Sequence, residues 1–275
     1  GTSAWDTTPT LVDKLTVQKN SASAIIQIGT YHDTEATAPI LEFLKGDGSA
    51  ASPSVVDDNA VLGQINFYGY EDSDSAAQGA SITARVDGTP SDGDMPTELI
   101  FATSADDSES PTTRMTISPD GLITKPNTPA FRAANTDGGG GYLRQSTSTG
   151  TIPFNDDSST GLFDNGNNYD ASTNYRFTAP VDGYYYFGVS FFFYSSYDTS
   201  KNVYIAIVAS DGSQSTVNRG EVNDDGGFSV QGVFKLDEND TVECQVVGGD
   251  GTVTDRNVYT WRTEEFNSFQ GFLIG

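Results

Sequence analysis

The side chains that most often carry catalysis are scarce in this chain and lie far apart in its sequence. His32 is the only histidine and stands among acidic residues, whereas the only cysteine, Cys244, lies in the apolar alternation VECQVV and is predicted to be buried. A Ser/His/Asp or Cys/His device would have to join these distant stretches. The sequence contains neither a glycine-rich phosphate loop that opens a helix nor the His/Cys spacing of a zinc site. We therefore predict that the protein is not an enzyme.

Carboxylates are the one abundant reactive group, with 38 Asp and Glu residues in the chain. A carboxylate pair could cleave a glycosidic bond, but this abundance singles out no particular pair. These carboxylates could instead bind a hard cation, because Ca²⁺ binds Asp, Asn and carbonyl oxygens on flexible loops, and Mg²⁺ also prefers oxygen ligands. The candidate ligands are Asp156, Asp157, Asp164, Asp170, Asp224 and Asp225. The alternative is that they are solvated surface carboxylates; no cofactor is required by any other feature.

The charge balance excludes several classes of partner. The 38 acidic residues face only 14 basic ones, which gives a net charge of −24. Such a surface repels nucleic acid and anionic membranes. No run approaches the roughly 18 apolar residues of a membrane-spanning helix, so no membrane insertion is expected. The composition fits a halophilic protein working in salty water, where screening weakens self-repulsion, but an ordinary acidic secreted protein would look similar.

The aromatic stretch 175–197 is the longest β-favouring run in the chain. Pro180 and Gly183 divide it into a short strand, a tight turn and a long strand. Because side chains alternate along a strand, one face is predicted to be core: Tyr185, Phe187, Val189, Phe191 and Phe193. The opposite face carries Tyr184, Tyr186, Phe192 and Tyr194, which are predicted to contact a neighbouring subunit. The alternative is that both faces are buried within one subunit.

The rest of the chain favours an all-β protein, because short apolar runs alternate with turn-forming residues and no run keeps a helical period. In the N-terminal half the strands are expected at 15–17, 24–28, 40–44, 62–68, 81–86, 98–103 and 114–117. In the C-terminal half they are expected at 203–209, 227–236, 241–247 and 266–274. The N-terminal strands are short and their loops long, so they would make a poor core in a monomer. A fibrous oligomer would resolve this difficulty.

Residues 86–123 combine a Val-Asp-Gly-Thr turn at 86–89, a Met-Pro-Thr strand at 95–103, an Arg-Met strand at 114–117 and an Asp-Gly turn at 120–121. In this order they resemble the shaft module of tailed-phage fibre and spike proteins. The resemblance extends more loosely over residues 1–125. It implies a fibrous β shaft.

The C-terminal half carries a second set of motifs: PAFRA at 129–133, Phe154-Asn155, FTAP at 177–180, Gly183-x-Tyr185-x-Phe187 and SFQGFLI at 268–274. Together they resemble the trimeric jelly-roll heads of complement's first component and, more distantly, the tumour-necrosis-factor (TNF) cytokines. One turn departs from the family, since its Gly-Asp-x-Val is here Asn239-Asp240-Thr241-Val242. Asn tolerates the left-handed conformation, so we expect the fold to survive. The resemblance implies a homotrimer.

These patterns predict a frayed segment at 1–10, a fibre shaft at 11–125 and a jelly-roll β-sandwich head at 126–275, with a Pro-punctuated hinge at 125–129. The order of parts suggests a virion fibre or spike, at the virion surface and extracellular, held by other tail or capsid proteins. Its head would bind a host cell-surface receptor, either glycan or protein, through the aromatic residues Tyr169, Tyr197, Tyr259 and Trp261. A depolymerising tailspike and a secreted complement-like lectin or adhesion module are the alternatives.

Overall fold

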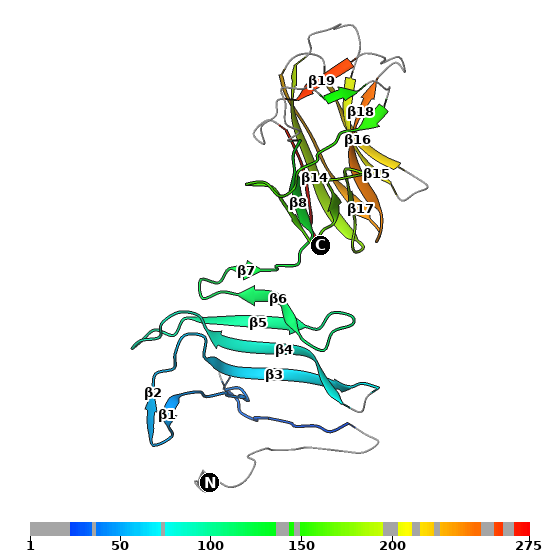
Figure 1. Ribbon diagram of the computed structural model, residues 1–275. Coiled ribbons are helices and arrows are strands. Elements are labelled where there is room, and N and C mark those ends of the chain that lie inside the picture. Colours follow the sequence, from blue (N-terminus) through cyan, green and yellow to red (C-terminus); the bar gives the residue numbers. More distant parts are fainter. Residues whose placement is uncertain are drawn as a thin grey trace.

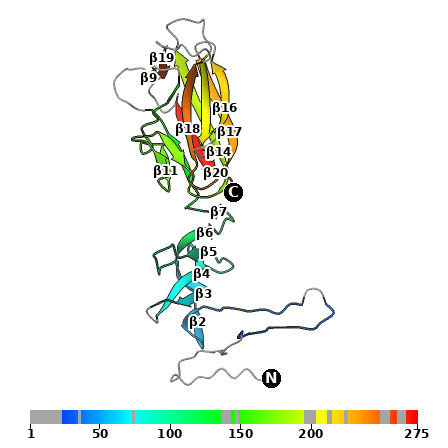
Figure 2. The ribbon, with the colours of Figure 1, turned by 90° about the vertical axis from the view of Figure 1, so that its right-hand side faces the viewer.

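The computed structural model describes residues 23–34, 37–72, 75–135, 143–145, 149–194, 203–210, 215–222, 226–248, 256–260 and 267–275. Every regular element among them is a β-strand, which confirms the predicted all-β class. In this part of the chain there is no helix that could cross a membrane. The strands form an N-terminal group that ends at Thr124 and a C-terminal group that begins at Ala130 (Figure 1 and Figure 2).

The N-terminal group consists of a two-stranded hairpin and a five-stranded antiparallel sheet. The hairpin pairs β1 (Asp47–Ser49) with β2 (Ser52–Ser54). The sheet contains, in spatial and chain order, β3 (Val61–Tyr70), β4 (Ala76–Val86), β5 (Thr97–Thr103), β6 (Thr112–Ile117) and β7 (Ile123–Thr124). Each strand pairs with the next along the chain, so the whole sheet is a meander.

Four of the seven strands predicted for this half are confirmed, at 62–68, 81–86, 98–103 and 114–117. The predictions at 24–28 and 40–44 are wrong, because these residues are described and form no strand. Their apolar patterning suits a strand, but a strand also needs a neighbour for its backbone N–H and C=O groups. The described part of this chain supplies none. The strand predicted at 15–17 lies outside the described residues.

The C-terminal group is a sandwich of two antiparallel sheets, as predicted. The β14 sheet contains β11 (Phe163–Asn165), β8 (Ala130–Ala133), β20 (Ser268–Leu273), β14 (Gly183–Tyr194), β19 (Arg256–Thr260) and β9 (Leu143–Gln145), with β17 (Gly226–Leu236) also paired to β14. The β18 sheet contains β12 (Tyr169–Asp170), β13 (Arg176–Thr178), β18 (Thr241–Gly248), β15 (Val203–Ser210) and β16 (Ser215–Val222), with β10 (Thr149–Thr151) paired to β18. The strands predicted in this half correspond to β13, β14, β15, β17, β18 and β20.

The two sheets of the sandwich enclose a core rich in aromatic rings. The ring of Phe131 stacks on Tyr169 with centroids 4.5 Å apart and on Phe177 at 5.3 Å. Phe187 meets Phe177 edge-on at 5.4 Å. Such pairs contribute about 0.5–1.5 kcal/mol each beyond the burial of their area. Tyr185, Phe187, Val189 and Cys244 are all buried, as predicted, whereas the side chains of Phe191 and Phe193 lie outside the described residues.

The structure also tests the predictions made for the turn at Asn239 and for the hinge at 125–129. Asn239 has a φ of 72°, so the residue that replaces the family's glycine does adopt the left-handed conformation. The connector at 125–129 has the proline content of a hinge, but it is held by hydrogen bonds. The backbone N–H of Thr128 donates to Lys125 O at 3.1 Å, and that of Leu273 to Pro129 O at 3.0 Å. No described strand pairs across this connector, and the domain boundary at residue 125 stays a prediction.

Candidate functional site

The outward face of the β14 sheet carries a group of exposed or half-buried apolar side chains. We call it the outer aromatic face, and it consists of Tyr184, Tyr186, Val233, Phe272 and Ile274. Strand register explains why they gather, since Tyr186 pairs with Val233 of β17 on one side and with Phe272 of β20 on the other. Tyr184 remains 55% exposed and Phe272 46% exposed. A monomer therefore leaves an apolar patch open to water, which is typical of an interaction surface.

Tyr186 is held in a defined position on this face. Its ring centroid lies 5.2 Å from that of Phe272, and its hydroxyl donates to Oε1 of Gln231 at 2.7 Å. A Cβ added to Gly188 would lie 3.0 Å from the Tyr186 hydroxyl, so the glycine leaves room for the ring to lie along the sheet. An aromatic side chain ordered in advance loses little conformational entropy when a partner covers it.

The electrostatics of the outer aromatic face differ from those of the chain as a whole. The outward-facing positions of β14, β17 and β20 contain Lys235 and no carboxylate among the described residues. The chain as a whole carries a net charge of −24. The exposed carboxylate of Asp237, just beyond β17, lies 3.9 Å from the Lys235 ammonium, so two copies could approach each other here with little carboxylate–carboxylate repulsion.

The structure places only part of the predicted subunit interface. Tyr184 is exposed and Tyr186 half-buried, so the alternative of burial on both strand faces within one subunit does not hold for Tyr184. Phe192 and Tyr194 are in β14, but their side chains lie outside the described residues. Whether any of the four contacts a subunit stays a prediction. Val233, Phe272 and Ile274 were missed, although the cross-strand register of β17 and β20 with β14 places them beside the predicted tyrosines.

One predicted receptor-binding residue is wrong. Tyr169 is only 5% exposed, and its hydroxyl donates to Phe154 O at 3.1 Å inside the sandwich. Burial raises the pKa of this phenol. The residue lies in a run of Asp, Asn and Gly that suggests an exposed loop, but β12 turns its ring onto Phe131. Tyr259 lies in β19 with its side chain outside the described residues, and Tyr197 and Trp261 lie wholly outside them.

Three of the candidate metal ligands shape their own turns. Oδ1 of Asp170 accepts the backbone N–H groups of Ser172 and Thr173, each at 2.9 Å, and these bonds lower the pKa of its carboxyl group. Asp164 also accepts backbone donors, from Asn168 at 3.1 Å and Tyr169 at 3.0 Å. Its partial burial nevertheless dominates and raises its pKa.

Asp156 follows the same pattern, since its Oδ1 accepts the N–H groups of Ser158 and Ser159, both at 3.0 Å. Within the described ranges no three His, Cys, Asp or Glu side chains lie close enough together to hold an ion. Asp224 and Asp225 lie outside these ranges, and Asp157 is described but belongs to no such group. Binding of Ca²⁺ or Mg²⁺ stays a prediction.

The two candidate catalytic side chains are not brought together. Cys244 lies in β18, fully buried, and its burial raises the pKa of the thiol. A thiol kept protonated is a poor nucleophile. His32 is exposed before β1, where its Nδ1 accepts the N–H of Thr34 at 3.0 Å. The described residues therefore give no Cys/His pair.

Comparisons with known proteins concern mainly the sandwich. The family model described as the C1q domain matches residues 133–274. Similar solved structures include the globular domain of zebrafish complement 1qA (21% identity, TM-score 0.37, covering 54% of this chain and 98% of that one). Murine APRIL at pH 8.5 is also similar (9% identity, TM-score 0.39, covering 53% of this chain and 98% of that one). The carboxy-terminal domain of the bacteriophage T5 L-shaped tail fibre is a third similar structure (20% identity, TM-score 0.34, covering 39% of this chain and 40% of that one).

No curated protein sequence matches the chain. Because the identities and TM-scores of the solved structures are low, the assignment to a family rests on the family model.

Proposed function

This chain belongs to the C1q domain family through residues 133–274, and we propose that it is a virion fibre or spike whose C1q head binds a receptor on a host cell. The C1q domain is a family of binding modules and not of enzymes. The observation that carries the proposal is this domain, preceded by a β-sheet with almost no core of its own.

The proposed fibre is a homotrimer, and the outer aromatic face is its subunit interface in the head. That face is exposed, apolar and free of carboxylates at the positions named above, which are the properties expected where acidic copies must meet. Because each copy carries a charge of −24, assembly should weaken at low ionic strength.

The fibre role is supported by the order of parts. The sequence likeness of residues 86–123 to phage shaft modules supports the proposal of a shaft before the head, as in a fibre held by tail or capsid proteins at the virion surface. Receptor binding is assigned to the loops of the head distant from the connector, because loops on a rigid sandwich carry recognition. Tyr197, Tyr259 and Trp261 remain the proposed contact residues, and Ca²⁺ or Mg²⁺ bound to acidic loops could order them.

The interface is tested by Phe272→Glu, which places a carboxylate beside Tyr186 on the apolar face. Sedimentation equilibrium of the wild type should give a trimer, and the variant should dissociate at micromolar concentration. Thr160→Glu adds the same charge at an exposed loop position and should leave the trimer intact. A monomeric wild type would refute the proposed assembly.

The receptor role is tested by adding purified protein to susceptible host cells. We expect saturable adherence and a fall in virus adsorption, and both should weaken in Trp261→Ala but not in Met95→Ala, which removes an exposed apolar side chain of the N-terminal sheet's loops. A fall in the size of host surface polysaccharide would instead identify a depolymerase. Adherence to cells without any effect on adsorption would favour a secreted adhesion module.

A further inference from the structure

One face of the five-stranded sheet is apolar across all its strands. Register aligns Ile65, Ile82, Phe101 and Met115 in one row, and Gly63, Ala84, Leu99, Ile117 and Ile123 in the next. We call these two rows, together with Phe67, the apolar shaft face. It contains no charged residue, in a chain with a net charge of −24.

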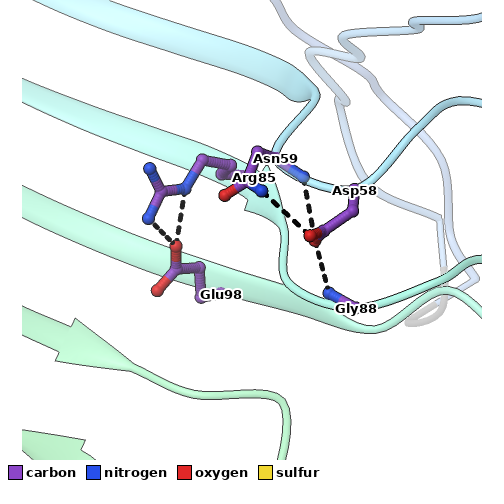
Figure 3. A network of polar contacts seen from close by, with 5 residues as sticks. All are labelled: Asp58, Asn59, Arg85, Gly88 and Glu98. Atoms are coloured by element: carbon purple, nitrogen blue, oxygen red, sulfur yellow. Dashed lines mark hydrogen bonds and ion pairs between the residues drawn. The ribbon is translucent and has the colours of Figure 1, made fainter.

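Apart from Val86 at its end and the contact of Phe43 with Gly63, the apolar side of this sheet is left without a cover by the described residues. On the opposite face Ser81 and Glu98 are buried, and Arg85 pairs with Glu98 (Figure 3). On the apolar shaft face, by contrast, no residue is fully buried: the central ones are half-buried, whereas Phe67 is 52% exposed and Ile123 60% exposed. A sheet normally buries its apolar face and leaves its polar one in water. The missing cover must therefore come from elsewhere.

A second apolar segment of the same half is also uncovered. We call residues 23–34 and 37–46 the arm, which Figure 2 shows projecting away from the sheet as a long dark-blue loop. Its large apolar side chains are exposed, from 48% for Ile28 to 98% for Leu44. Apart from the bond from Thr37 N to Thr34 O at 3.0 Å, its described residues form no backbone–backbone hydrogen bond outside strands.

The root of the arm is fixed at the apolar shaft face. The Cβ of Phe43 lies 2.7 Å from where a Cβ on Gly63 would stand, so Phe43 packs directly against the glycine at the start of β3. Gly63 belongs to the row that ends at Ile123, on the apolar side of the sheet. The arm therefore leaves its own chain from the edge of the face that lacks a cover.

We infer that the arm of each copy packs across the apolar shaft face of a neighbouring copy, so that every chain gives one arm and receives one. The inference rests on the oligomer of the proposed function and names the contact that builds its shaft. A second copy fits better than an unrelated partner, because every copy carries one arm and one apolar shaft face. The uncharged face also lets acidic chains approach each other. Their apolar residues then leave water together, which is the main drive for association.

Paired cysteines in separate chains test the arm exchange on the full-length protein. One tagged chain carries Ile40→Cys in the arm, and a chain with a different tag carries Ile65→Cys in β3. After co-expression, a bifunctional thiol reagent should join the two tags. The wild type, whose only thiol is the buried Cys244, should give no product.

Two results would overturn the inference. With both cysteines in one chain, a cross-link confined to that chain would show that the arm folds back on its own sheet. No product in trimers that remain intact would show that the arm lies elsewhere. In either case the head could still form trimers and bind host cells, so the proposed function would stand.

A charge placed in the arm gives an independent measurement. Ile28→Glu should raise the concentration at which trimers dissociate by about tenfold or more, because a buried carboxylate would replace a buried aliphatic group. Gln27→Glu adds the same charge at the adjacent exposed position and should change it far less. Equal dissociation of the two variants would contradict arm exchange, whereas a monomeric wild type would contradict the proposed function itself.

Discussion

The side-chain amide of Asn165 donates to the carbonyl oxygen of Pro126 at 2.7 Å, which ties the sandwich to the connector that leaves the N-terminal sheet. The same nitrogen also donates to Thr128 O at 2.7 Å. A side chain of β11 thus fixes two carbonyl groups in a segment rich in proline, where few backbone N–H groups are present to hold it.

The first prediction is that Asn165→Ala loosens this connector. The range of distances between a spin label on the N-terminal sheet and one on the head should broaden, because two carbonyls lose their donor. Electron–electron double resonance on the full chain would measure it. Thr128→Ala keeps the carbonyl groups and should leave the distribution narrow, and equal widths in both variants would contradict the assignment.

The second prediction concerns the closest approach in the core. A Cβ at Gly271 would lie 2.6 Å from Cε1 of Phe187 and 3.0 Å from Cε1 of Phe131, so Gly271→Ala should overpack the sandwich. We expect a loss of about 1–3 kcal/mol in the free energy of unfolding, measured by urea denaturation. Gly275→Ala meets nothing within 4 Å and should have little effect. A neutral Gly271→Ala would mean that the aromatic rings can shift.

The third prediction concerns the ion pair of the N-terminal sheet. Nε of Arg85 donates to Oε1 of the buried Glu98 at 2.6 Å (Figure 3). Arg85→Ala would leave this carboxylate without its partner, at a cost of about 1–3 kcal/mol. The urea midpoint of the sheet should fall, whereas Lys45→Ala breaks an exposed pair with Asp47 and should cost about 1 kcal/mol or less. Equal effects would show that water compensates Glu98.

The fourth prediction concerns acid stability. Backbone donors hold the pKa of Asp170 below its ordinary value of 3.8, so the carboxylate stabilises the fold above that pH. This contribution should be lost as the pH falls through the lowered pKa. The difference in melting temperature between the wild type and Asp170→Asn should therefore narrow from pH 5 to pH 2. Parallel curves would indicate that the turn does not depend on the charge.

The β14 strand shows what a single sequence can predict well. Its period-two alternation and its boundaries at Pro180 and Gly183 are local properties, so the strand and its inward face follow from the residue pattern alone. Asn239 is a similar case, since its left-handed φ follows from a local turn. The match of the C1q family model to residues 133–274 confirms the resemblance found for the head.

Tyr169 and the arm show where residue patterns mislead. Tyr169 is buried because β12 pairs with β13, a contact set by the whole sandwich and invisible in a run of Asp and Asn. The apolar pattern at 24–28 and 40–44 is that of a strand. It cannot indicate that its own chain offers no strand beside it. Val233 and Phe272 could not be assigned for the same reason, because only the register brings them to Tyr186.

The ends of the head meet at one pole of the sandwich. The N–H of Tyr184 donates to Gly275 O at 2.9 Å, and the N–H of Leu273 donates to Pro129 O in the connector. These hydrogen bonds hold the first residues of the head beside its last strand, β20. A reporter fused after Gly275 should therefore emerge beside the connector, at the same pole of the sandwich.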